Sequence, residues 1–190
     1  MAFSAGFHPH PRISYANAAP TGTASEAEYF EIQLRKRRDL TQVHRDLDAA
    51  LPADLAIVLV REAVPGALAD LLEASDWVLA FADVDLRVLQ SAVSTMLERE
   101  RIDVTRMMKR GPRTFDVREA VLAAAAASSE DRSYPVHLAL RLRHLTPSVR
   151  PDDVMSALAE VAGFHSRRPA LMTRLRQGPL REDGTVGDPL

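Results

Sequence analysis

The stretch VHLALRLR at residues 136–143 decides the fold, because it is the clearest strand pattern in the chain. Large apolar residues alternate with His, Ala and Arg, which is typical of a strand with one buried face. Upstream, the apolar run WVLAFA at residues 77–82 predicts a second strand. The segments between these two runs therefore determine how the sheet is connected.

The intervening segments predict two helices and a hairpin. Asp85 is the expected N-cap of an amphipathic helix over 85–100. Two β-rich runs, 102–108 and 114–117, flank a turn, and the Ala-rich stretch 118–127 predicts a second helix. The order from residue 77 to residue 143 is then β-α-β-β-α-β, which is that of a ferredoxin-like unit.

The first half of the chain predicts the same unit with two elements missing. Strands are expected at 12–17, 29–34 and 55–60, with a helix over 39–51 before the last of them. This order lacks the initial strand and helix. We therefore predict an α+β protein of two tandem ferredoxin-like units, the first incomplete. Another chain, self-association or residues upstream of Met1 would complete its open sheet.

The expected domain boundaries follow from these elements. A further helix should begin at Pro151, with Asp152 and Asp153 in its first turn and Gly163 as its stop, and the residues after Phe164 show no periodicity. The predicted divisions are an incomplete unit at 1–64, a linker with a short helix at 65–76, a complete unit at 77–145, a C-terminal helix at 146–165 and an irregular tail at 166–190.

The composition of the 190 residues excludes several kinds of site. The chain has no cysteine, so it has no disulfide, thiolate zinc site, iron–sulfur cluster or cysteine nucleophile of its own. No apolar run is long enough to cross a bilayer, and the N-terminus lacks the pattern of a secretory signal. We expect a cytoplasmic protein that carries no cofactor of its own.

Charge is divided unevenly along the chain, although the formal net charge is -2. Residues 26–85 contain 13 acidic and 6 basic side chains, whereas residues 86–181 contain 10 acidic and 17 basic side chains. A basic half is typical of a protein with an RNA or acidic-protein partner. An Arg-rich surface without such a partner is the alternative.

The most unusual segment lies close to the N-terminus. In an extended segment His8 and His10 face the same side, so both imidazoles could hold one metal ion or one phosphate. The spacing does not identify a third ligand, for which Glu26 and Glu28 are candidates. A rigid turn whose histidines bond to the backbone is the alternative. The candidate residues here are Gly6, Phe7, His8, Pro9, His10 and Arg12.

Two later segments are candidate binding loops. Thr21, Gly22, Ser25 and Glu26 could offer donors to an anion, although a plain hairpin loop explains the same residues. In the second segment a basic hairpin tip predicts phosphate contacts, with an aromatic residue beside it to stack on a base. The candidates there are Lys109, Arg110, Arg113, Phe115 and Arg118.

Several of these stretches together resemble one bacterial family. They are the string at 2–14, the residues at 20–22 and 25–29, and the later segments 109–111, 115–118 and 149–154. These residues are similar to the radical-SAM-linked, or radical-SAM-associated, family. This family has no known function and is found fused to, or encoded with, cobalamin-binding radical SAM proteins. The stretches at 173–180 and 183–190 are similar to the tail of stand-alone actinobacterial members.

This sequence also differs from the family in one respect. Family members begin upstream with a strand and an Arg-rich helix, which are missing here, so Met1 is expected to be an internal start. The resemblance implies partnership with a radical SAM enzyme that supplies the iron–sulfur cluster and the radical chemistry. The family has no established activity to carry over, so the resemblance does not identify catalytic residues in this chain.

Three functions remain open at this point. The first is a non-catalytic accessory or substrate-presenting partner of a radical SAM enzyme. The second is an RNA-binding or RNA-modification factor that uses the basic second half. The third, for which the residues argue least, is a metal- or phosphate-dependent enzyme centred on His8 and His10. No serine, histidine and carboxylate set stands at a diagnostic spacing.

Overall fold

The computed structural model describes residues 1–5 and 7–190, which form two compact units. Unit 1 comprises residues 1–18, 29–70 and Leu190, and unit 2 comprises residues 19–28 and 71–189. Both units contain strands and helices, which confirms the α+β class. Residues 19–28 belong to unit 2, although the segments on both sides of them belong to unit 1.

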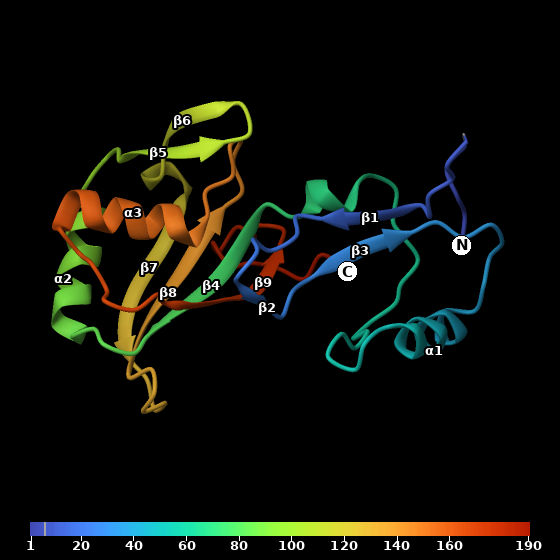
Figure 1. Cartoon of the computed structure of the whole chain (residues 1–190), viewed down its shortest axis with the longest axis horizontal. Coiled ribbons are helices and arrows are strands. Elements are labelled where there is room, and N and C mark those ends of the chain that lie inside the picture. Colours follow the sequence, from blue (N-terminus) through green and yellow to red (C-terminus); the bar gives the residue numbers. More distant parts are fainter. Residues whose placement is uncertain (6) are drawn as a thin grey trace. The chain divides into compact units, whose positions relative to one another are not determined.

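Unit 2 is built on a five-stranded sheet (Figure 1). Its strands are β2 (Ala24–Ser25), β4 (Ala74–Phe81), β7 (Val121–Ser128), β8 (Val136–Arg143) and β9 (Leu171–Gly178). The strand order is β2-β9-β4-β8-β7. The pairs β4–β8, β4–β9 and β7–β8 are antiparallel, and the short β2 pairs parallel with β9.

Two helices, α2 (Leu86–Leu97) and α3 (Pro151–Ala162), cover one face of this sheet (Figure 1). The Asp85 carboxylate accepts from the backbone N–H groups of Arg87 and Val88, at 2.8 and 3.2 Å, which confirms the predicted N-cap. The predicted bounds of α3 are also confirmed, because it starts at Pro151 and ends before Gly163, whose φ is 63°.

The connections in unit 2 interleave. Helix α2 leads from β4 toward β7, and β8 lies between those two strands. Helix α3 leads from β8 to β9, and β4 lies between them. This is the split β-α-β arrangement, with its elements placed differently from the prediction for 77–143. The hairpin of β5 (Asp103–Met108) and β6 (Gly111–Asp116) is an insertion between α2 and β7.

The core of unit 2 lies between the sheet and the helices. Along β8 the burial alternates, with Val136, Leu138, Leu140 and Leu142 buried, as the strand prediction requires. The core cluster runs from Trp77 to Phe164 in sequence, so it lies wholly within unit 2. Its packing includes an edge-to-face contact of Phe81 with Phe164 at a centroid distance of 5.9 Å.

The prediction of a helix over 118–127 is wrong. A 3-10 turn at Arg118–Ala120 leads directly into β7. Alanine favours helices, but pairing with β8 and burial of alternate residues override that preference. Ala124 and Ala126 pack against the core, and the Gln90 side-chain amide of α2 donates to the Ala126 carbonyl at 3.4 Å.

The prediction of an irregular tail from residue 166 is also wrong. Residues 171–178 form β9, which pairs with β4. Its pattern does not alternate, because Arg174 and Gln177 are polar but buried and because the register shifts opposite Asp76 and Trp77. Helix α3 and residues up to 189 belong to unit 2, so they are not the separate segments that we predicted.

Unit 1 contains a two-stranded sheet and one α-helix. Strand β1 (Ile13–Ala16) pairs antiparallel with β3 (Tyr29–Ile32), and α1 spans Leu40–Ala50. The Asp39 carboxylate accepts from the Gln42 N–H at 3.0 Å, which confirms the predicted cap of α1. A 3-10 helix, η1 (Leu68–Leu71), lies near the end of this unit.

The tandem arrangement of two ferredoxin-like units is not confirmed. The predicted strand at 55–60 belongs to no sheet in the described part of the chain. The described part of unit 1 therefore contains one strand pair, α1, most of η1 and an extended segment that pairs with neither strand. Among residues 1–5 and 7–190, no helix combines the length and apolar character needed to cross a bilayer.

Candidate functional site

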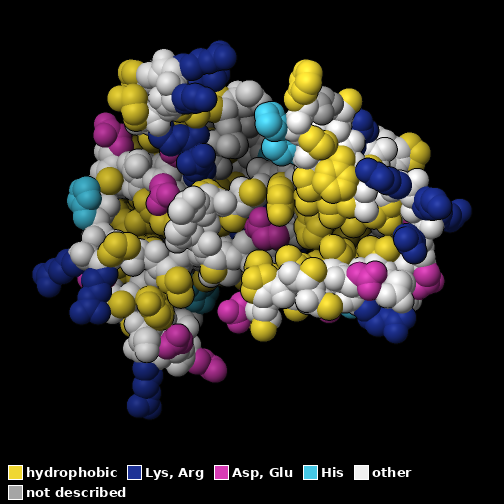
Figure 2. All heavy atoms as spheres, turned by 45° about the vertical axis from the view of Figure 1, so that its right-hand side comes forward, with side chains coloured by type: hydrophobic (Ala, Val, Ile, Leu, Met, Phe, Trp, Pro, Cys, Tyr) yellow, Lys and Arg dark blue, Asp and Glu magenta, His cyan; other side chains and the backbone are white. Residues whose placement is uncertain are grey.

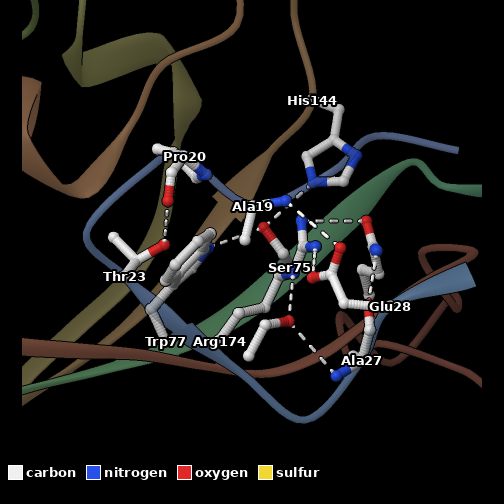
Figure 3. A network of polar contacts seen from close by, with 11 residues as sticks. Ala19, Pro20, Thr23, Ala27, Glu28, Ser75, Trp77, His144 and Arg174 are labelled. Atoms are coloured by element: carbon white, nitrogen blue, oxygen red, sulfur yellow. Dashed lines mark hydrogen bonds and ion pairs between the residues drawn. The ribbon is translucent and has the colours of Figure 1, made fainter. Parts of the chain in front are cut away.

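A buried arginine organises the polar interior of unit 2 (Figure 3). Arg174, on β9, is 1% exposed, and its guanidinium forms an ion pair with Glu28. It also donates to the Ser25 hydroxyl at 3.2 Å and to the Gln177 side-chain carbonyl at 3.3 Å. The Trp77 ring lies beneath it, with the guanidinium carbon 5.5 Å from the ring centroid. Each nitrogen of the buried cation therefore has a partner, as burial of a charge requires.

These contacts hold residues 19–28 in unit 2. The Gln177 side-chain amide donates to the Ala27 carbonyl at 2.6 Å, and the Glu26 N–H donates to the Arg174 carbonyl at 2.8 Å. Glu28 accepts from the Ala19 N–H at 3.4 Å with its other carboxylate oxygen. Residues 19–28 are therefore fixed to β9. The four residues of this segment that were predicted to bind an anion lie in different surroundings.

Of those residues, Ser25 faces the buried arginine, whereas the Glu26 side chain is exposed. Thr21 and Gly22 form the exposed part of a turn that the Thr23 hydroxyl closes by donating to the Pro20 carbonyl at 2.7 Å. Gly22 has a φ of 88°, which favours glycine. The plain loop therefore explains Thr21 and Gly22, and the four residues do not converge on one anion site.

A serine–histidine pair lies next to Arg174. The Nε2 of His144 lies 2.9 Å from the Ser75 hydroxyl, and its Nδ1 lies 2.6 Å from the Leu72 carbonyl. Nδ1 therefore carries the proton, and Nε2 accepts from Ser75. Burial lowers the pKa of His144, and the Arg174 charge lowers it further, so the ring is neutral at pH 7.

This pair has the atoms of an activated nucleophile but not its accessibility. Ser75 is 2% exposed, and its hydroxyl accepts from the Trp77 indole N–H at 2.8 Å. A hydroxyl that is buried and already hydrogen-bonded in this way cannot be reached by a substrate. We therefore assign Ser75 and His144 a structural role, in which they link β4 to the end of β8.

The N-terminal candidate residues lie in unit 1, on an exposed loop. Phe7, His8, Pro9 and His10 are all exposed, and Gly6 lies outside the described residues. Phe3 forms a β-bridge with Pro11 across the base of the loop. The described residues contain no group of three or more His, Asp or Glu side chains placed to hold a metal ion. Glu28, one predicted third ligand, instead pairs with Arg174.

Some of the basic residues that were predicted to contact nucleic acid are exposed on the hairpin of unit 2. Lys109, Arg110 and Arg113 are exposed on β5–β6 and the two-residue turn between these strands. Phe115, however, is 8% exposed, and the guanidinium carbon of Arg106 lies 5.0 Å from the centroid of its ring. The ring therefore has no face available for stacking on a base. The predicted stacking role of Phe115 therefore does not fit this structure.

Two further arginines near the hairpin are structural. Arg106, which we did not single out, forms an ion pair with the buried Asp153 and donates to the Ser148 carbonyl at 3.1 Å. Burial raises the pKa of Asp153 despite this pair and its bond from the Arg150 N–H. Arg118, predicted as a nucleic-acid contact, donates to the Val121 carbonyl at 2.9 Å and is half-buried.

An open groove lies between α2 and the end of α3. Its volume is about 550 Å³, and it is lined by side chains that include Arg87, Ser91, Thr95, Val161 and His165. These residues include neither a carboxylate nor a buried charge that would identify a ligand. The groove therefore gives no direct indication of chemistry.

The most unusual surface of the molecule is the apolar surface of unit 1. Among the described residues, the buried hydrophobic side chains of unit 1 are Ala16, Val43 and Leu68. Figure 2 shows a broad hydrophobic area on its right-hand part, edged by Lys and Arg side chains. The exposed large hydrophobic residues of unit 1 are Met1, Phe3, Phe7, Ile13, Tyr15, Leu40, Leu55, Val58, Leu59, Val64 and Leu190.

Two polypeptide segments beside this surface each have an edge that pairs with no strand of the described chain. β3 pairs with β1 along one edge, and within the described chain no strand pairs with its other edge. In the extended segment, Ile57 is anchored to α1, since its N–H donates to the Asp48 carboxylate at 2.7 Å and its carbonyl lies 2.5 Å from His44 Nε2. Residues 58–64 make no backbone–backbone hydrogen bond within the described chain.

Comparison with known proteins matches the chain to a family but gives no activity for it. A family model described as "Uncharacterized protein conserved in bacteria (DUF2344)" matches residues 1–151. No curated protein and no solved structure matches the chain. The match covers all of unit 1 up to Asp70 and most of the strands of unit 2.

Proposed function

We propose that this chain, which belongs to the bacterial family of uncharacterized proteins DUF2344, is a non-catalytic accessory protein that binds a partner polypeptide through unit 1. The observation that carries this proposal is the open, apolar surface of unit 1, where one edge of β3 and residues 58–64 pair with no strand of the described chain. Exposed apolar patches rimmed by polar groups are typical of interaction sites. Unpaired strand edges accept strands from other chains.

Unit 2 indicates what unit 1 lacks. In unit 2 each pair of strands joined by a helix has a third strand between them, which is β8 in one case and β4 in the other. In unit 1, α1 joins β3 to the extended segment 55–60, and no described strand lies between them. One strand inserted there, antiparallel to both, would pair with the open edge of β3 and with residues 55–60, and would give unit 1 the same strand order as unit 2. With that added strand unit 1 would match unit 2, so the proposal includes the predicted tandem arrangement of two ferredoxin-like units.

The occupant that we propose is an extended segment of the partner protein. Its side chains should alternate between apolar and polar, because one face would lie on the same side of the sheet as the exposed Val58 and the other would face water. The apolar β-branched sequence of residues 57–60 favours pairing as a strand.

We propose a radical SAM enzyme as this partner, on the resemblance carried by residues 2–14 and 20–29. The chain has no cysteine, so a cysteine-held iron–sulfur cluster would have to belong to the partner. The serine–histidine pair of the described residues, Ser75 and His144, is closed off from substrate. An accessory or substrate-presenting role is consistent with both observations.

The test uses the full chain and a purified cobalamin-binding radical SAM protein from the same bacterium. We expect a complex whose affinity falls at least tenfold in Val58→Asp and is unchanged in Met107→Asp. Both residues are exposed and apolar, at 93% and 75%, but Met107 lies on the hairpin of unit 2. Absence of a complex, or equal loss in both variants, would contradict the proposal. Sedimentation of the chain alone as a dimer sensitive to Val58→Asp would assign the surface to a second copy instead.

RNA binding through unit 2 is the second candidate function. The specific observation is that Lys109, Arg110 and Arg113 are exposed and make no ion pair in the described structure. Such a site would lose affinity as salt rises. A gel shift with structured RNA at low salt, abolished by reversing these three charges, is the expected result, and a shift that survives the reversal would reject this site.

A further inference from the structure

A second basic cluster lies in unit 1, in the half of the sequence that is acidic by count. Residues 35–38 read Arg-Lys-Arg-Arg, and all four are exposed. Arg12 is also exposed, and neither residues 1–18 nor residues 32–38 contain an acidic residue. Five cations therefore lie in two segments that have no acid of their own.

The structure brings these two segments together. The Ala2 N–H donates to the Gln33 carbonyl at 2.7 Å, and the Gln33 N–H donates to the Arg12 carbonyl at 3.0 Å. The Arg12 guanidinium donates to the Gln33 side chain at 2.8 Å. Two residues further along, the guanidinium carbon of Arg35 lies 5.7 Å from the centroid of the Phe3 ring. The N-terminal loop and the start of the basic run thus share one end of unit 1.

The acidic residues close to this cluster neutralise little of it. Glu62 pairs with Arg37, although both side chains are largely exposed. Asp39 is occupied as the N-cap of α1. Glu31 is half-buried within β3. Arg12, Arg35, Lys36 and Arg38 are left without an ion pair in the described structure.

The N-terminal loop also carries an exposed aromatic ring. Phe7 is fully exposed, and Phe3 is 43% exposed. The loop that carries Phe7 is closed by two bonds, from the Ser4 N–H to the His10 carbonyl at 2.8 Å and from the His10 N–H to the Ser4 hydroxyl at 3.0 Å. Pro9 and Pro11 restrict its backbone further. Because the Phe7 ring is exposed, it takes no part in the core and is available for contact with another molecule.

We propose that this end of unit 1 binds single-stranded nucleic acid, with phosphates on Arg12, Arg35, Lys36 and Arg38 and a base stacked on Phe7. Cations that follow the backbone and an exposed aromatic ring are the two parts of such sites. The hairpin cluster of unit 2 has the cations but not the ring, because Phe115 is buried. The partner-binding proposal depends on the edge of β3 and on residues 58–64, so variants at Phe7, Lys36 and Arg38 test this inference separately.

The experiment is fluorescence anisotropy of a labelled 12-nucleotide oligouridine with the full chain at several salt concentrations. Four phosphate contacts give a slope of log affinity against log salt of about -3, since each contributes about -0.7 for single strands. We expect Lys36→Glu/Arg38→Glu to reduce the affinity at least tenfold and to flatten the slope by about half. Phe7→Ala should reduce the affinity about fivefold or more while leaving the slope unchanged.

The matched control is Arg167→Glu/Arg168→Glu, which makes the same charge change on two exposed residues of unit 2 that belong to neither proposed site. It should leave the affinity within about twofold of the original protein. A larger loss in this variant than in Lys36→Glu/Arg38→Glu would move the site to unit 2 and overturn the inference. So would no binding at 50 mM salt, an unchanged affinity in Phe7→Ala, or equal affinity for a poly-glutamate peptide of the same charge. Circular dichroism of each variant checks that the fold is retained.

Discussion

The two units use similar apolar sequence patterns with opposite results. In unit 2, alternating residues of β4 and β8 are covered by α2 and α3 and form one continuous core. In unit 1, the β-rich residues 55–60 follow a well-capped helix, yet Val58 is 93% exposed. An apolar strand is buried only when its sheet has enough strands and helices to cover it. This difference is the basis for our proposal that unit 2 is the scaffold and that unit 1 contacts a partner.

The largest expected effect comes from the core of unit 2. Leu138→Ala removes a side chain that is fully buried at the centre of β8, so the free energy of unfolding should fall by about 2–5 kcal/mol. Urea unfolding followed by the fluorescence of Trp77 measures this loss. A loss below about 1 kcal/mol would show that the core of unit 2 does not control stability.

The second prediction concerns the anchor of residues 19–28. Glu28→Ala leaves the Arg174 charge buried without its carboxylate, which should cost about 3 kcal/mol. Glu26→Ala, two residues away with an exposed side chain, is the control and should change the stability by less than about 0.5 kcal/mol. Equal effects in the same urea titration would contradict the role assigned to the Arg174–Glu28 pair.

The third prediction concerns pH. The pKa of His144 is lowered in the folded state, chiefly by burial, so the unfolded chain binds a proton at a pH where the folded chain does not. The contribution of His144 to stability is therefore present above pH 6.5 and declines as the pH falls below it, by at most about 1.4 kcal/mol per pH unit. His144→Gln should show a smaller loss between pH 7 and pH 5, whereas the exposed His165→Gln should not. Identical pH profiles for both variants would exclude His144 as the source.

The smallest expected effect lies in unit 1. Val58→Ala should change the free energy of unfolding by less than about 0.5 kcal/mol, because the side chain is already exposed. Comparison with Leu138→Ala in the same assay tests the contrast directly. A loss above 1 kcal/mol would mean that Val58 is buried in the free protein.

Local signals in the sequence were sufficient for some elements. The caps at Asp39 and Asp85 and the stop at Gly163 bound helices that form where expected. Strand β8 alternates cleanly because one of its faces is buried and the other is not. Strand β7 could not be recognised in the same way, because its alanines favour a helix until β8 and α2 pack against them.

Long-range contacts explain the remaining failures. The inward position of Arg174 depends on Glu28, which is 146 residues away, so no pattern within β9 reveals it. The extended segment 55–60 has a strand sequence, but strand formation requires a neighbour. The basic run 35–38 was visible as a local feature, yet counting charge over residues 26–85 concealed it.

The central claim is that the second edge of β3 and residues 58–64 are open to pairing with a partner strand, and amide hydrogen exchange tests it most directly. In the free chain, amides 58–64 should exchange rapidly while those of β8 remain protected. When the radical SAM protein is added, protection should appear at residues 29–32 and 58–64. Amides 58–64 as protected as β8 in the free chain, or protection confined to unit 2 in the complex, would contradict the account.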